Sequence, residues 1–136
     1  MDVGTDQLHE NIRLDSRVSS YEQMDIRDFA KIHTGNIYDI IVCDASFISL
    51  LDIIDPIISL AGTDTSIILL YKPQFEVGRE HLRHTGVPRD PKIVEKKMQE
   101  FESHLLQKNL NILEVKKSSL MGEAGNQEWI YLVQKS

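Results

Sequence analysis

Cysteine is nearly absent from this chain of 136 residues, in which Cys43 is the single example. One cysteine cannot form an intramolecular disulfide, so the sequence is not that of a disulfide-stabilised secreted domain. The five histidines show no metal-ligand spacing with Cys43, which argues against a zinc site. We therefore expect a cytoplasmic protein without a structural metal.

Long hydrophobic runs are also missing. No stretch approaches the roughly 18 apolar residues that a membrane span requires, and the most apolar segment, 48–61, is interrupted by Asp52, Asp55 and Pro56. The first ten residues contain acidic side chains and no apolar signal-peptide segment. We expect no membrane partner.

Basic charge is in short supply, because 15 Lys and Arg residues face 21 Asp and Glu residues and give a net charge of −6. Proteins that bind nucleic acid through their own surface usually carry a basic excess, since phosphate neutralisation supplies most of the non-specific affinity. If RNA is the substrate, regions mostly outside this chain must hold it. The one local basic cluster lies in segment 73–90 and comprises Arg79, His81, Arg83, His84 and Arg89.

Apolar periodicity predicts one α/β domain with a mainly parallel sheet. The runs YDIIVCD (38–44) and TSIILLYK (65–72) are typical of strands buried on both faces, and the segment between them is long enough for a crossover helix. The spacing of apolar residues predicts a helix over 91–109, with Asp90 as its N-cap. LNILEVKKSSL and EWIYLVQK predict a final antiparallel pair of strands.

The N-terminal part has weaker patterns. QLHENIRLD predicts a short helix, RVSSYEQ a short strand, and IRDFAKIH a second short helix. The connection 73–90 is longer than most loops of α/β domains, and loops of that length are usually functional or disordered.

Charged side chains stand at the ends of the predicted strands, where open parallel sheets bind their ligands. Asp44 closes the first apolar run and Lys72 closes the second, so a right-handed βαβ unit brings them to the same edge. Glu128 begins the last strand and reaches that edge if this strand is antiparallel. A helix cap at Asp44, a solvated strand end at Lys72 and a surface Glu128 are the alternatives.

Five strings occur in a characteristic order and spacing: DVGTDQL, YDIIVCDASFISL, YKPQFEVGRE, GVPRDP and GEAGNQEW. Together they resemble the TlyA hemolysin group of the FtsJ-like RNA methyltransferases, and the resemblance covers nearly the whole chain. It implies a Rossmann-like methyltransferase fold that transfers a methyl group from S-adenosylmethionine to a ribose 2′-hydroxyl of ribosomal RNA. Residues 1–136 would be a partial catalytic domain, truncated at the N-terminus. The first strand, the glycine-rich turn, the first tetrad lysine and an S4-like RNA-binding domain would be absent.

The resemblance also assigns roles to particular residues. The family's Lys, Asp, Lys, Glu tetrad matches Asp44, Lys72 and Glu128 in its last three members, with Lys72 as the base. S-adenosylmethionine would be bound by Asp2 at its ribose, by Asp25 near its adenine and by Asp44 near its methionine end. A disordered terminus for Asp2 and a helix cap for Asp25 remain open as alternatives.

The basic segment 73–90 allows two interpretations. Arg79 and Arg89 could belong to a lid that contacts RNA near the acceptor hydroxyl, or the segment could be a solvated loop.

Two other functions remain possible. The chain could be a truncated, catalytically silent domain with an interaction role, in which the exposed edge of an incomplete sheet is covered by a second copy. A membrane-acting hemolysin is disfavoured because the sequence has neither an apolar span nor a basic amphipathic helix.

Overall fold

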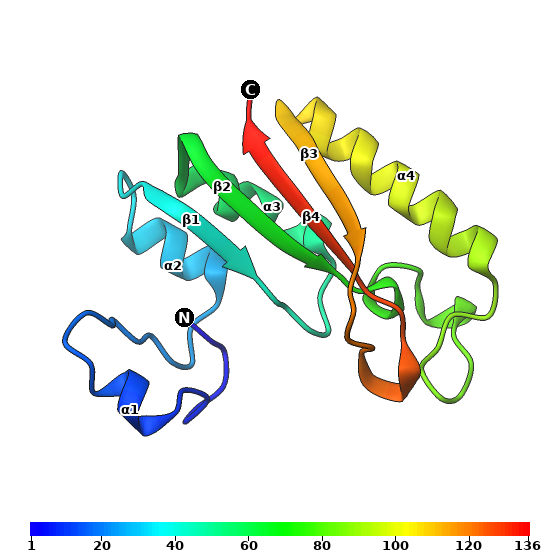
Figure 1. Ribbon diagram of the computed structural model, residues 1–136, viewed down its shortest axis with the longest axis horizontal. Helices are drawn as coiled ribbons and strands as arrows, with labels where there is room; N and C mark the ends of the chain where they lie inside the picture. The colour runs from blue at the N-terminus through cyan, green and yellow to red at the C-terminus, as the bar shows by residue number, and fades with distance from the viewer.

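The computed structural model describes residues 1–136 and is built on one four-stranded sheet (Figure 1). The strands are β1 (Tyr38–Cys43), β2 (Ala61–Tyr71), β3 (Leu110–Lys117) and β4 (Trp129–Lys135), in the order β1-β2-β4-β3. β1 and β2 are parallel, whereas β4 is antiparallel to both of its neighbours. Three strands therefore run in one direction and β4 in the other, which confirms the predicted mainly parallel sheet with an antiparallel C-terminal strand.

The longer helices form at the predicted places. α3 (Leu50–Ser59) is the crossover between β1 and β2, and Ser49 caps it by accepting a hydrogen bond from the amide of Leu51. α4 (Pro91–Gln107) has Asp90 as its N-cap, which accepts from the amide of Lys92. The apolar spacing of α4 turns Phe101 and Leu105 into the core.

One face of the sheet is covered by helices and the other is bare. Alternate residues of β2, among them Ile67, Leu69 and Tyr71, are fully buried in a core that also contains the apolar sides of α3 and α4. α2 (Ile26–Ile32) packs against α3 and against the start of the same face. The bare face is apolar and includes Ile40, Val42 and Ile130, all of which are exposed.

The long connection 73–90 is ordered. It contains the short 3₁₀ helices η1 (Pro73–Phe75) and η2 (Arg79–His81), followed by an isolated bridge between Leu82 and Pro88. Figure 1 shows it meeting the connection between β3 and β4, which contains η3 (Glu123–Gly125), near the start of α4.

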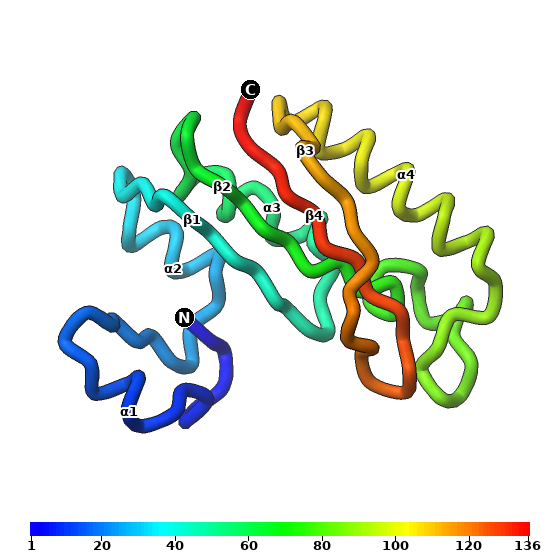
Figure 2. Tube along the Cα trace, in the orientation of Figure 1, coloured from blue at the N-terminus to red at the C-terminus, as the bar shows by residue number.

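The N-terminal segment extends away from the sheet and contains the single-turn helix α1 (Glu10–Arg13) (Figure 2). The prediction of a strand at RVSSYEQ was wrong, because 17–23 form no strand. Asp2 and Gly4 make backbone hydrogen bonds to 21–24, and the positive φ of Gln23, 51°, ends the extended run. These few backbone hydrogen bonds do not make a strand of this segment, because no further residues pair with it on either side.

None of the helices combines the length and the apolar character needed to cross a membrane.

Candidate active site

The centre of the candidate site is an ion pair between Lys72 and Asp44. Both residues directly follow parallel strands, so they emerge at the same edge of the sheet. Lys72 Nζ lies 2.6 Å from Asp44 Oδ1 and donates a hydrogen bond of 3.0 Å to Ser46 Oγ. The Lys72 side chain is 12% exposed and that of Asp44 is 64% exposed. The ammonium group is therefore largely enclosed, while the carboxylate faces solvent.

Glu128 lies on the same edge but has a different partner. Tyr71 pairs with Trp129 across β2 and β4, which places Lys72 and Glu128 next to one another along the edge. Glu128 is buried, and its Oε1 accepts a hydrogen bond of 3.0 Å from Gln74 Nε2. The structure thus joins Asp44 and Lys72 directly, and it makes no ion pair between Glu128 and Lys72.

Gly122 has no side chain, and the Glu128 carboxylate occupies the space that one would fill. A Cβ at this position would lie 2.2 Å from Glu128 Oε1, closer than any side chain tolerates. The Gly122 amide donates to the carbonyl of Asn126, which fixes the turn just before Glu128.

Glu76 joins the two loops that follow β1 and β2. Its carboxylate accepts hydrogen bonds from Ser49 Oγ at 2.6 Å and from the amide of Leu50 at 2.8 Å. Burial raises the pKa of Glu76, and the two hydrogen bonds oppose that rise. Because Ser49 and Leu50 begin α3, Glu76 holds the loop carrying Asp44 and Ser46 against the loop that follows Lys72.

An exposed aromatic side chain follows Ser46, the residue that accepts a hydrogen bond from Lys72. Phe47 is 85% exposed and has a φ of +64°, a conformation that is strained for a bulky residue. Its ring centroid lies 5.0 Å from that of Phe75. Strained backbone of this kind clusters at functional sites, and an open ring face can stack on a planar ligand.

The candidate cofactor residues Asp2 and Asp25 are brought near one another. Asp2 exchanges backbone hydrogen bonds with Tyr21 and Met24, which places it beside the start of α2. Its Oδ1 accepts from the amide of Gly4 and its Oδ2 has no partner. The Asp2 carboxylate is therefore available to a ligand.

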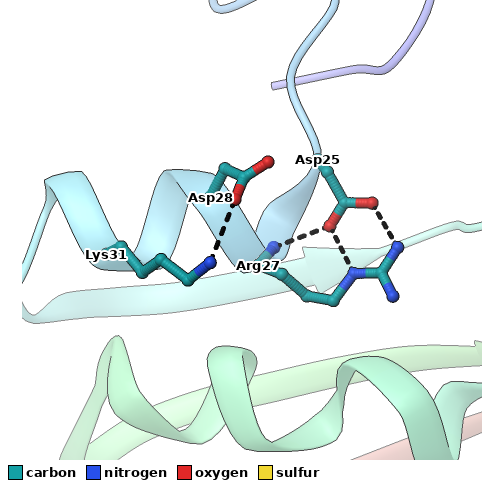
Figure 3. Close-up of polar contacts among 4 residues, drawn as sticks. All are labelled: Asp25, Arg27, Asp28 and Lys31. Atoms are coloured by element: carbon teal, nitrogen blue, oxygen red, sulfur yellow. Dashed lines mark hydrogen bonds and ion pairs between the residues drawn. The ribbon is translucent and has the colours of Figure 1, made fainter.

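Asp25 is the N-cap of α2, the alternative that its sequence position left open (Figure 3). Its Oδ1 accepts from the amide and from Nε of Arg27, both at 2.8 Å, and Oδ2 pairs with Arg27 Nη2 at 2.7 Å. These bonds lower the pKa of Asp25 to about 2. The Asp25 carboxylate is already engaged by its own helix.

The two arginines of the basic loop differ in their contacts. Arg89 Nε donates to the carbonyl of Leu82 at 2.8 Å, so this side chain helps to hold the loop. Arg79 lies in η2 and makes no ion pair. Of the two, Arg79 has the guanidinium that is free to meet a phosphate.

Metal ligands do not gather at this site or elsewhere, because no three His, Cys, Asp or Glu side chains come together. Burial, with a smaller contribution from Asp44, raises the pKa of Cys43 to about 11. The raised pKa keeps Cys43 in its thiol form at neutral pH.

Comparison with known protein families matches residues 1–135 to the FtsJ-like methyltransferase model. A 23S rRNA (cytidine-2′-O)-methyltransferase TlyA from Campylobacter jejuni is 37% identical over 132 residues, which are 96% of this chain and 50% of that protein. A 16S/23S rRNA (cytidine-2′-O)-methyltransferase TlyA from Mycobacterium tuberculosis is 34% identical over 94% of this chain and 48% of that protein. The chain thus spans about half the length of the curated relatives it matches.

Solved structures agree with this assignment. A structure from Lactococcus lactis described as a candidate hemolysin superposes with a TM-score of 0.90 at 32% identity, over 99% of this chain and 65% of that one. The fold is therefore the Rossmann-like methyltransferase fold that the resemblance implied. From its family match, its relatives and its fold, the chain belongs to the FtsJ-like methyltransferase family.

Proposed function

We propose that this chain carries the acceptor end of an RNA 2′-O-methyltransferase site, with ribosomal RNA as substrate and S-adenosylmethionine as methyl donor. The observation that carries the proposal is the enclosed Lys72 ammonium paired with Asp44 at the carboxyl edge of the sheet. The substrate class is supported by the rRNA methyltransferases to which the chain is similar. Because ribosomal RNA is cytoplasmic in bacteria such as these relatives' sources, we place the reaction in the cytoplasm.

Lys72 is the proposed base. S-adenosylmethionine, when bound, supplies an electrophilic methyl group on a sulfonium. The Lys72 ammonium would first release a proton to solvent, and the resulting amine would accept the proton of the ribose 2′-hydroxyl as the 2′-oxygen bonds to the methyl carbon and the carbon–sulfur bond breaks. Asp44 and Ser46 fix the direction of Nζ before the transfer. Correct placement of the two reacting atoms supplies much of the rate enhancement.

Glu128 and Phe47 complete the acceptor side in this proposal. The Gln74 amide and the absence of a side chain at Gly122 hold the buried Glu128 carboxylate in one position along the edge. From there it orients the acceptor ribose. The exposed ring of Phe47 stacks on the base of the same nucleotide, since RNA bases commonly stack on aromatic side chains.

The residues of this chain fit the methyl donor only in part. Asp2 has one carboxylate oxygen without a partner, which suits the ribose hydroxyls of S-adenosylmethionine, and Asp44 faces solvent at the methionine end. Asp25 contributes to the adenine side only through the backbone around it, because its carboxylate is bound to Arg27. Calorimetry with S-adenosylmethionine tests this fit: heat that saturates in the micromolar range supports it, and no heat at millimolar cofactor contradicts it.

The RNA contact of this chain is the loop 73–90, in which Arg79 is a free cation. Arg89 supports the loop from within. The larger RNA-binding surface, such as an S4-like domain, would belong to the part of the relatives that this chain does not match. Residues 1–136 accordingly form a partial catalytic domain in this proposal.

For the chain on its own, we further propose that a second copy covers the bare sheet face and the edge of β1. The register aligns Val42, Ile68 and Leu132 across three strands, and Leu70 and Ile130 form a second apolar row. Parallel sheets are normally covered on both faces. A silent domain retained for interaction would use the same surface.

Methyl transfer tests the proposed chemistry directly. Radiolabelled S-adenosylmethionine is incubated with the chain and ribosomal RNA, and label in the RNA is counted. Lys72→Met is expected to lower the rate by about 100-fold or more, the usual contribution of a general base. Asp44→Asn should lower it as well, since Lys72 loses its charged partner.

Lys108 provides a matched control. Its Nζ pairs with Asp55 Oδ1 at 2.8 Å, an ion pair between the C-cap of α4 and α3. Lys108→Met removes the same charge from an exposed pair, where the effect on stability is small. Transfer should be unchanged in this variant. Equal losses in Lys72→Met and Lys108→Met, or no label at all with the parent chain, would contradict the proposal.

A further inference from the structure

A cavity of about 590 Å³ opens on the helix-covered face, close to the candidate active site but separate from it. Pro73, which follows Lys72, and Trp129, which follows Glu128, both line it. The remaining walls come from α4 between Pro91 and Glu102, the end of the loop 73–90 and the connection between β3 and β4, which meet in Figure 1. Its volume lies within the range of small-molecule sites, roughly 300 to 1,000 Å³.

The walls are mainly apolar and one of them is aromatic. Val94 and Met98 come from α4, Pro73 and Pro88 from the loop, and Trp129 from the start of β4. Lys117 also lines the cavity, and its Nζ lies 5.3 Å from the centre of the Trp129 ring, a cation–π contact. An apolar slot with an indole in its wall suits a flat aromatic ligand.

The outer wall is held in place by hydrogen bonds. Asn126 Nδ2 donates to the carbonyl of Gly86 at 3.2 Å and to that of Glu123 at 3.0 Å, which ties the loop 73–90 to the connection before β4. The bridge between Leu82 and Pro88 closes the tip of the same loop. The cavity is thus formed before any ligand binds.

The polar lining determines which aromatic ligand fits. Glu95, Glu102 and Lys117 line the cavity, so its charged lining carries one excess negative charge, which disfavours phosphate in the interior. Glu102 Oε1 accepts a hydrogen bond of 2.9 Å from Tyr131 Oη, which fixes the carboxylate, and Oε2 makes no protein hydrogen bond. A fixed carboxylate oxygen is an acceptor for an exocyclic amine, as carboxylates are for the N4 amine of cytosine.

We propose that this cavity is a subsite for an amino-bearing nucleobase of the RNA, next to the nucleotide that is methylated. The base lies against Trp129, its exocyclic amine donates to Glu102, and its phosphate remains outside. That the ligand is RNA rests on the proposed function. Uracil fits less well, because its one free N–H is flanked by two carbonyl oxygens that a carboxylate repels.

Trp129 is the chain's single tryptophan and lines this cavity, so its fluorescence reports on ligand binding there. The test is titration of its fluorescence with cytidine, adenosine and uridine, without S-adenosylmethionine. Cytidine and adenosine should quench it in a saturable manner, with dissociation constants at least about fivefold lower than that of uridine, a conservative value for one lost charged hydrogen bond. Absence of saturable quenching, or equal binding of all three nucleosides, would overturn the proposal.

Two substitutions in α4 distinguish the effect of the Glu102 carboxylate on binding from the effect of removing any negative charge from the helix. Glu102→Gln should weaken cytidine binding and reduce its advantage over uridine. Glu100→Gln is the matched control, because Glu100 lies on the same helix and does not line the cavity. Equal effects of the two substitutions would contradict the assigned role of Glu102.

Failure of the base subsite and failure of the proposed methyl transfer give different experimental results. Lys72→Met should keep the quenching while it loses methyl transfer. Quenching without any methyl transfer would support the base subsite and contradict the proposed function. Methyl transfer without saturable quenching by the nucleosides would overturn the base subsite and leave the proposed function intact. The same holds if an added apolar peptide quenches Trp129 and none of the nucleosides does.

Discussion

Asp25 shows how local hydrogen bonds decide the state of one carboxylate. The side chain of Arg27, and then its backbone amide, lower the pKa of Asp25 to about 2. Arg27→Ala should raise that pKa toward the ordinary value of 3.8, because the guanidinium bonds are lost. An NMR titration of the Asp25 carboxyl measures this shift. Lys31→Ala, which removes only a minor coulombic contribution, should shift it much less.

The same pair has a predictable effect on stability. A carboxyl whose folded pKa is lowered stabilises the fold above its unfolded pKa, and this contribution is lost as the pH falls through the folded value. For Asp25 the window runs from about pH 3.8 down to about pH 2. Asp25→Ala should also cost about 1 kcal/mol of unfolding free energy at neutral pH as a lost N-cap. Urea denaturation at several pH values measures both effects, and an unchanged midpoint would contradict them.

Gly122 is a position where one methyl group should matter. Its φ of −74° suits any residue, so only the contact with Glu128 opposes a side chain. Gly122→Ala should displace Glu128 or destabilise the fold by roughly 1 to 3 kcal/mol, the usual effect of overpacking. Thermal unfolding compares it with Gly4→Ala, where the nearest atoms lie at 3.2 Å in flexible, exposed side chains. Similar effects of both substitutions would contradict the assigned contact.

The site residues divide into those that sequence could predict and those that it could not. Asp44 and Lys72 could be predicted, because both end apolar strands of one βαβ unit and strand direction alone brings them together. Gln74, Glu76 and Phe47 could not be assigned in the same way. Their contacts depend on how two loops pack, and no spacing rule describes that packing. Asp25 could be read as a cap or as a ligand, and its bonds to Arg27 were needed to decide.

At the scale of elements, α3 depends on a carboxylate from a distant loop. Burial raises the pKa of Glu76 above 4.5, so the folded state holds its proton more tightly than the unfolded state. Its stabilising contribution is present at low pH and is lost as the pH rises through the raised value. Glu76→Gln keeps an acceptor for the Leu50 amide and cannot ionise. The difference in unfolding free energy between Glu76→Gln and the parent chain should therefore shift in favour of the variant as the pH rises. Denaturant unfolding at pH 4 and pH 8 tests this. An opposite trend would contradict the burial argument.

Elements with a strong apolar pattern were predicted well, whereas among the weaker N-terminal patterns the strand at RVSSYEQ was not. The runs that became β1 and β2, and the spaced apolar positions of α4, carry signals that tertiary packing reinforces. RVSSYEQ has only a local preference for extended backbone. A strand requires neighbours on at least one side, and here the only partners are a few residues near Asp2.

At the scale of the whole molecule, the bare sheet face is the dominant feature. Exposed apolar patches of this kind mark interaction surfaces. The proposed second copy predicts a dimer in sedimentation equilibrium, and Val42→Glu should convert it to a monomer by placing a charge in the apolar row. Leu106→Glu is the matched control, since Leu106 is 60% exposed on α4 and away from that face. A monomeric parent chain at all concentrations would contradict the proposed self-association.

The most direct test of the account is the position of the methyl group. RNA methylated by this chain is digested to nucleosides and analysed by mass spectrometry, with the Lys72→Met variant in parallel. Because the proposed base is Lys72, held by Asp44, the expected product is a 2′-O-methylated nucleoside that disappears in Lys72→Met. A methyl group on a base, or a 2′-O-methyl group that persists without Lys72, would contradict it.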